Sequence, residues 1–147
     1  MSSESTLLYR RAGSTLPKRE LREFVNRLRS ELAGHRSFTC LLTNDRELQR
    51  LNRMFLKRDY AADVLSFPSG TEEQLGELAI SVERAAEQAN AFGHTITEEI
   101  KILMLHGLLH LLGMNHENDR GAMARAELRW REHLGLQVSG LIERSRK

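Results

Sequence analysis

Three of the chain's six histidines lie within a short stretch and could together bind a metal ion. They are His106, His110 and His116, and the first two lie four residues apart in an apolar segment that predicts a helix. Residues four apart share one helical face, with Cβ atoms roughly 6 Å apart. Gly113 lets the chain leave the helix in a left-handed conformation, so that His116 can return to the same point. Three imidazoles and one open position are the ligand set of a catalytic zinc ion.

The alternative is that His106 and His110 are core residues, hydrogen-bonded to carbonyl groups. The predicted helix is apolar nearly all round, and each buried polar group left unsatisfied costs about 1–3 kcal/mol. One shared metal ion removes that cost for both rings, so the sequence favours a single Zn²⁺. Three neutral ligands leave such an ion its full double charge, which lowers the pKa of a bound water to about 7.

The spacing of the three histidines and Gly113 equals that of the metzincin proteases, H-E-x-x-H-x-x-G-x-x-H, except at one position. Gly107 stands where those proteases have their general-base glutamate, and a glycine cannot transfer a proton. A zinc peptidase or amidase would therefore need a base from elsewhere, such as Glu117 or Glu77. The sequence predicts a metal-dependent hydrolase with a different chemistry.

Residues 106–116, HGLLHLLGMNH, resemble the signature of the YbeY family of bacterial rRNA-maturation endoribonucleases. Residues 63–68 and 76–81 also resemble the family pattern, and the resemblance extends from about residue 43 over most of the chain. It implies an α+β fold and a single-strand-specific, metal-dependent endoribonuclease that acts in 16S rRNA 3′-end maturation and ribosome quality control. The implied partners are single-stranded RNA, rRNA, and the ribosome or its small subunit. A non-enzymatic ribosome-associated protein with a structural zinc is a further alternative.

The sequence departs from the family pattern at two positions. Asn115 precedes the third histidine, where the family usually has aspartate, and Leu56 stands where many members have an RNA-contacting arginine. Lys57 and Arg58 are nearby stand-ins and our candidate catalytic cations, because a cation can neutralise phosphate charge as it develops. Arg53 is a third candidate. The alternative reading of all three is a solvated loop.

The composition is that of one globular domain, with 40% hydrophobic and 29% charged residues in a 147-residue chain and a net charge of +2. The single cysteine, Cys40, excludes an internal disulfide, and we expect it in the core. The N-terminus lacks the pattern of a secretory signal, and the longest apolar stretch, residues 102–112, is too short to span a bilayer. We therefore expect a cytoplasmic protein with no membrane partner. Aromatic residues make up only 5%, which leaves few platforms for stacking RNA bases.

Hydrophobic periodicity and punctuating residues predict an α+β domain over residues 1–147. The family resemblance implies that a small mixed sheet packs against several helices. The metal site would lie on a central helix and the turn after it. His35, His94 and His133 are expected at the surface or at helix ends, and Asp119 is expected to cap the last helix. The predicted helices are 17–33, one that starts after Asn44, 82–92, one that follows a Thr95 capping box and ends at 112, and 120–133; the predicted strands are 37–42, 63–68 and 75–81; about 136–147 form a flexible tail.

Overall fold

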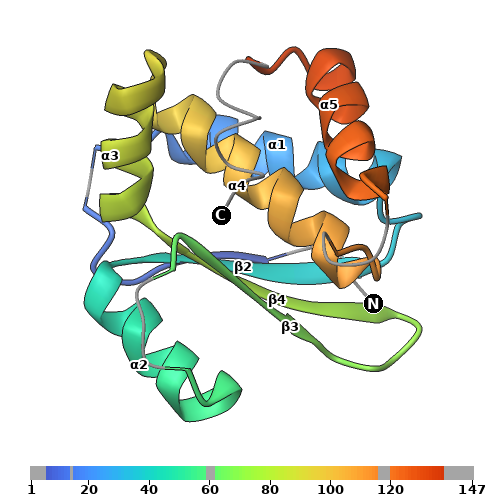
Figure 1. The fold of residues 1–147 in the computed structure, drawn as a ribbon, viewed down its shortest axis with the longest axis horizontal. Coiled ribbons are helices and arrows are strands. Elements are labelled where there is room, and N and C mark those ends of the chain that lie inside the picture. Colours follow the sequence, from blue (N-terminus) through green and yellow to red (C-terminus); the bar gives the residue numbers. More distant parts are fainter. Residues whose placement is uncertain (1–5, 14, 59–61, 116–119, 138–147) are drawn as a thin grey trace.

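A four-stranded mixed sheet forms the centre of the structure, a computed structural model that describes residues 6–13, 15–58, 62–115 and 120–137 (Figure 1). The strand order is β1 (Thr6–Tyr9), β2 (Ser37–Thr43), β4 (Gln74–Ser81) and β3 (Val64–Pro68). β1, β2 and β4 run parallel, and β3 pairs antiparallel with β4. The predicted α+β class and mixed sheet are confirmed.

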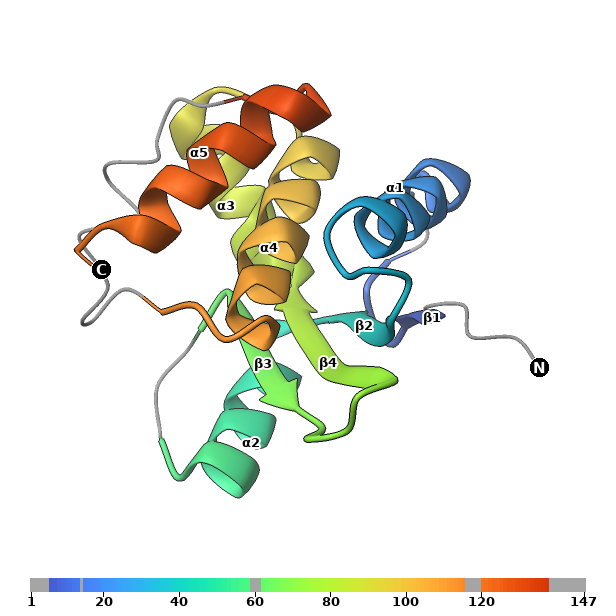
Figure 2. The same cartoon turned by 90° about the vertical axis from the view of Figure 1, so that its right-hand side faces the viewer.

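Helices cover both faces of this sheet. On one face α4 packs against β3 and β4, with α1, α3 and α5 around it, and α2 covers the other face (Figures 1 and 2). The sheet therefore separates α2 from the helix that carries the paired histidines. In the described residues no helix is both long and apolar enough to cross a membrane. The helices are α1 (Lys18–Glu31), α2 (Asp45–Leu56), α3 (Val82–Phe92), α4 (Ile96–Leu111) and α5 (Ala122–Leu134).

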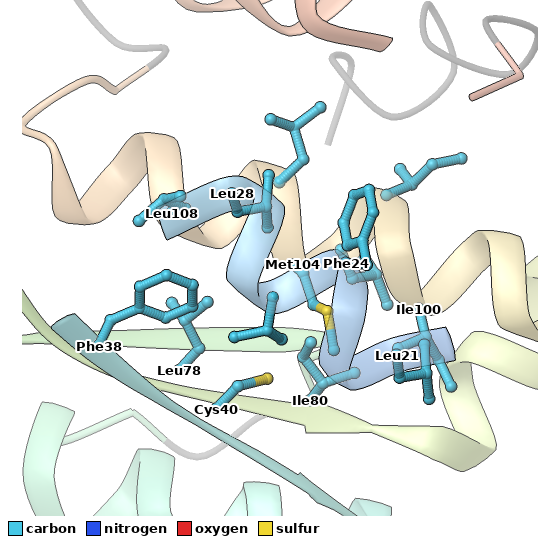
Figure 3. Packing of buried hydrophobic residues seen from close by; sticks show 14 of the residues in the cluster. Leu21, Phe24, Leu28, Phe38, Cys40, Leu78, Ile80, Ile100, Met104 and Leu108 are labelled. Carbon is cyan, nitrogen blue, oxygen red and sulfur yellow. The ribbon is translucent and has the colours of Figure 1, made fainter. Parts of the chain in front are cut away.

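The main core lies between the sheet and α4. Alternate residues of β2 point into it, because the side chains of a strand alternate between its two faces. These residues are Phe38, Cys40 and Leu42, and all three are fully buried. Apolar faces of α1 and α4 pack over them (Figure 3). A smaller cluster under α2 contains Leu48, Leu65 and Ala79. The residues of the main core labelled in Figure 3 are Leu21, Phe24, Leu28, Phe38, Cys40, Leu78, Ile80, Ile100, Met104 and Leu108.

Capping residues fix most helix ends where the sequence predicts them. The side chain of Asn44 accepts a hydrogen bond from the Glu47 N–H at the start of α2, and that of Thr95 accepts one from the Glu98 N–H at the start of α4. α3 ends at Gly93, whose φ of 74° is a left-handed conformation. These interactions set where α4 begins, and so where its histidines lie.

Several expectations need correction. β1 has no counterpart among the predicted strands. α5 begins at Ala122 after an N-cap at Gly121, two residues later than predicted, and Asp119 lies outside the described residues. His94 was expected at the surface or at a helix end; it does lie between the end of α3 and the start of α4, but its side chain is 3% exposed and its Nε2 atom lies 2.5 Å from Oε1 of the fully buried Glu99. His35 and His133 are exposed, as predicted.

The expected flexible tail falls mostly outside the described residues. Its first two residues are held by contacts: Leu136 is buried in the main core, and the Gln137 N–H donates to the Glu98 carboxylate. The backbone N–H of Leu136 also donates to the carbonyl oxygen of Arg131.

Candidate active site

The last two turns of α4 bring His106 and His110 together. Their Nε2 atoms are 3.2 Å apart, and the ring centroids are 4.8 Å apart with an angle of 74° between the planes. Most of the helix around them is buried, including Leu105, Leu108 and Leu109. Both histidines are only partly buried, so the paired nitrogens lie at the edge of the core.

This separation fits two ligands of one zinc ion. Two nitrogens at about 2.0–2.1 Å from a tetrahedral metal are about 3.3 Å from each other. His106 and His110 can therefore hold the same cation with hardly any movement. Without a cation, the same contact requires one of the two rings to donate a hydrogen to the other.

The predicted third ligand, His116, lies outside the described residues, as does Glu117. The turn before it has the expected form, because Gly113 has a φ of 98° and its N–H donates to the carbonyl oxygen of His110. Within the described part of the chain, no group of three histidine, cysteine, aspartate or glutamate side chains could hold a metal ion. A third ligand would have to come from outside the described residues, where the predicted His116 lies.

Two residues in contact with this pair or with each other, Glu127 and Arg131, were not singled out by the sequence reasoning. The Nδ1 atom of His106 lies 2.6 Å from Oε1 of Glu127, and the other oxygen of this carboxylate accepts a hydrogen bond from Arg131 at 2.7 Å. Both residues belong to α5 and are buried. Their spacing of four residues reads in the sequence as an ordinary helix-surface ion pair, and only the packing of α5 on α4 brings Glu127 to the histidine.

The environment of Glu127 favours its ionised form. Burial by itself raises the pKa of this carboxyl group, but hydrogen bonds and charge interactions with His106 and Arg131 outweigh burial, so the pKa is lowered overall. An ionised Glu127 accepts the Nδ1 hydrogen of His106. In the neutral form of the ring, this places the lone pair on Nε2, which faces His110. This is the tautomer that a metal ligand needs.

Gly107, at the position of the metzincin base, faces the sheet. A Cβ atom here would lie 2.8 Å from Leu78 Cδ2 and 3.1 Å from Val64 Cγ2. The Ser66 hydroxyl also donates to the Gly107 carbonyl oxygen. The position therefore serves the close contact of α4 with β3 and β4, and a side chain on it would point away from the paired nitrogens.

The candidate cations lie on the other side of the sheet from α4. Lys57 and Arg58 are exposed residues that follow the last turn of α2, and Lys57 has a left-handed φ of 58°. Leu56, which replaces the family's arginine, packs against the cluster under α2. Glu77, one of the two alternative bases named from the sequence, is exposed on β4. Ala79, two residues further along the strand, packs toward α2. Strand alternation puts Glu77 on that same face, away from His106.

Comparisons with known proteins find relatives of one family. A model of the family described as "Endoribonuclease YbeY" matches residues 11–135. A Solibacter usitatus protein named Endoribonuclease YbeY is 58% identical over 140 residues, which cover 95% of this chain and 94% of the relative. A Koribacter versatilis protein of the same name is 44% identical over 84% of this chain and 81% of its own length.

The fold also has a counterpart among solved structures. The solution structure of a Thermotoga maritima protein matches with a TM-score of 0.60 and 24% identity, and the match covers 93% of this chain and 98% of that one. The family match spans α1 to α5 and includes both paired histidines. On these similarities, the chain belongs to the YbeY family of endoribonucleases.

Proposed function

We propose that this protein is a zinc-dependent, single-strand-specific endoribonuclease that acts in 16S rRNA 3′-end maturation and ribosome quality control. The observation that carries the proposal is the pair of Nε2 atoms 3.2 Å apart, one of them on a ring that a buried carboxylate orients. The endoribonuclease names of the relatives support the reaction class. The proposed setting is the cytoplasm, with the ribosome or its small subunit as partner.

The residues that would hold one zinc ion are His106, His110 and His116. Bound there, zinc would activate water and counter the negative charge that develops on a phosphate. The chain's own contribution is orientation: Glu127 accepts the Nδ1 hydrogen of His106 and so keeps Nε2 available. Gly107 contributes no acid or base, and its role is to allow α4 to lie close against the sheet.

The RNA strand would be bound in part by the end of α2. Phe55 is 60% exposed, and its ring is held edge-on against Phe67, with centroids 5.9 Å apart. Lys57 and Arg58 follow it directly and are exposed. An exposed ring beside cations suits single-stranded RNA, because bases stack on aromatic faces while phosphates attract positive charge. In this proposal the two cations neutralise phosphate.

The path of the strand follows from the topology. β3 is an edge strand, and its first residue, Val64, lies against Gly107 on the face of α4. Leu65, the next residue, packs on the face of α2. An RNA strand that passes around the β3 edge would contact the end of α2 on one side and approach the histidine pair on the other.

A cleavage assay tests the proposal. The substrates are a single-stranded RNA that contains the 16S 3′ region, its fully paired duplex, and casein. We expect the zinc-loaded protein to cut the single strand only, and chelated protein or the His110→Ala variant to cut none of them. Product ends identify the attacking group, because a 2′,3′-cyclic phosphate means attack by the RNA's own 2′-hydroxyl. Cleavage of casein with no cleavage of RNA would overturn the proposal in favour of a peptidase.

A further inference from the structure

We infer that Arg131 is a positioning residue for the metal site, which acts through Glu127 to fix the orientation and tautomer of the His106 ring. The inference rests on the proposed function, because it treats His106 as a metal ligand. The juxtaposition that carries it is a buried chain of three groups: Arg131 NH2 donates to Glu127 Oε2 at 2.7 Å, and Glu127 Oε1 lies 2.6 Å from His106 Nδ1.

The carboxylate of Glu127 is held by both of its oxygens. Oε1 faces His106 and Oε2 faces Arg131, so the group cannot rotate without losing one of these contacts. Removal of Arg131 would leave a buried carboxylate with one fewer partner to fix its plane. The His106 ring would then lose the constraint that directs its Nε2 atom toward His110.

Burial of Arg131 is costly and is not explained by packing alone. The side chain is 0% exposed, and the loss of hydration of a buried ion costs several kcal/mol even when the ion is paired. Apolar residues of similar volume commonly replace such pairs without loss of stability. The guanidinium gives something that an apolar side chain cannot, which is a planar donor that fixes a carboxylate.

Arg131 is itself held from the other side. Its NH1 atom donates to the carbonyl oxygen of Gln137 at 3.1 Å. The side chain of Gln137 lies 2.6 Å from Nδ1 of His94, and its backbone N–H donates to Glu98 in the first turn of α4. The polar network thus joins α5, and residue 137 after it, to the start of α4 and reaches His106 in the second half of α4. Contacts from both α4 and α5 therefore fix the orientation of the His106 ring.

The test measures zinc affinity and stability separately. The variants are Glu127→Leu, Arg131→Met and the double variant, in which neither polar group remains. Each single variant leaves a buried charge without its charged partner and should lower the unfolding temperature, whereas the double variant should recover much of the loss. Zinc affinity, measured by competition with a chelator, should fall about 10–100-fold in Glu127→Leu. Zinc affinity should also fall in Arg131→Met. In the double variant, zinc affinity should be as low as in Glu127→Leu, even though stability recovers.

A second measurement does not need metal. In chelated protein, the ¹⁵N shifts of the His106 ring report which nitrogen carries the hydrogen. We expect the Nδ1–H tautomer in the wild type and a mixture in Arg131→Met. If Arg131→Met does not fold, Arg131→Lys, which keeps the charge but loses the planar fork, serves in its place with a smaller expected effect. Leu134→Ala, a core truncation on the same helix, is the matched control: it should lower stability and leave zinc affinity unchanged.

The outcomes distinguish this inference from the proposed function. If zinc affinity recovered together with stability in the double variant, Arg131 and Glu127 would be merely structural, and the inference would be overturned while the nuclease proposal stands. The inference would also be overturned if a folded Arg131 variant had the zinc affinity and the His106 ring ¹⁵N shifts of the wild type. If the wild type itself bound no zinc at the histidines, both the inference and the zinc-dependent function would fall.

Discussion

Gly107 lies where α4 comes closest to the sheet, and its neighbours explain the absence of a side chain. The atoms nearest to a Cβ at this position belong to Leu78 and to Val64, whose branched side chain is stiff. A metzincin glutamate here would enter the core between α4 and the sheet and could not reach the paired imidazoles. Packing thus decides this position, and the likeness to the protease motif is confined to the three histidines and Gly113.

Gly107→Glu should therefore destabilise the protein and create no peptidase. Overpacking and burial of a carboxyl group together should cost more than about 3 kcal/mol of unfolding free energy. Urea unfolding followed by circular dichroism measures this loss. Ala86→Glu, at an exposed site within α3, is the control and should change stability by less than about 0.5 kcal/mol. A fully stable Gly107→Glu variant would contradict the packing argument.

Cys40 shows how burial changes the pKa of an ionisable side chain. Loss of hydration raises the pKa of its thiol to about 12. An unfolded cysteine has a pKa near 8.5, so above that pH the unfolded chain releases a proton that the folded chain keeps. The unfolding free energy should fall by up to about 1.4 kcal/mol per pH unit there. Cys40→Ala should lack this contribution when stability is compared at pH 8 and pH 10.

The same burial should protect the thiol from reagents. Native protein at pH 8 should react with a disulfide reagent only as fast as it unfolds, and the reaction should become rapid in denaturing urea. Rapid modification of the folded protein would mean that Cys40 is accessible, contrary to its position in the main core.

At the scale of elements, local signals account for most of what the sequence predicts. α3 has the predicted bounds because Ser81 caps its start and Gly93 ends it. Both are single residues whose effect needs no distant partner. The paired histidines were predictable for the same reason, since a spacing of four residues on one helix determines that they meet.

Long-range contacts account for what was missed. β1 has only four residues, and it is a strand because residues 6–9 pair with residues 39–42 of β2. Glu127 and His94 look like ordinary surface residues until α5 and residue 137 pack against α4. No sequence motif indicates these contacts between distant parts of the chain. The third ligand, His116, and the cations Lys57 and Arg58 stay predictions.

The end of α2 yields a prediction about RNA binding. Phe55→Ala should weaken the affinity for a single-stranded oligonucleotide about 5- to 150-fold, because a stacked base contributes about 1–3 kcal/mol. A Lys57→Glu, Arg58→Glu variant should weaken it further and reduce its salt dependence. Binding is measured by fluorescence anisotropy in a His110→Ala background, so that the RNA stays intact.

The control for this prediction is Leu8→Ala. Leu8 is another exposed hydrophobic residue, 48% exposed, but it lies on β1 at the opposite edge of the sheet from β3. Its substitution should leave RNA affinity unchanged. Equal affinities for wild type and Phe55→Ala would remove α2 from the binding surface. An unchanged affinity for RNA with loss of binding to a ribosomal protein would instead assign the surface to a protein partner.

In the molecule as a whole, the hydrophobic core and the candidate metal site are distinct parts of the structure, so we expect the fold not to depend on bound metal. The main core extends from β2 through α1 and α4 and includes residues of every described helix except α2. The paired histidines are only partly buried and lie at its edge. A domain of this length buries enough apolar surface to fold by hydrophobic packing. The fold should therefore persist without metal, unlike that of a small zinc-dependent module.

Removal of metal should abolish activity and leave the fold intact. We expect chelated protein and a His116→Ala variant to keep the circular dichroism spectrum of the wild type and a cooperative thermal transition, while RNA cleavage is lost. Zinc in hundredfold excess over its dissociation constant adds only about 2.7 kcal/mol, so the melting temperature should fall by several degrees upon chelation. A structural zinc would behave differently, because its removal would unfold the chain at room temperature. Unfolding of both the chelated protein and the His116→Ala variant would favour the non-enzymatic alternative. The stability of the core without metal thus distinguishes a catalytic zinc from a structural one.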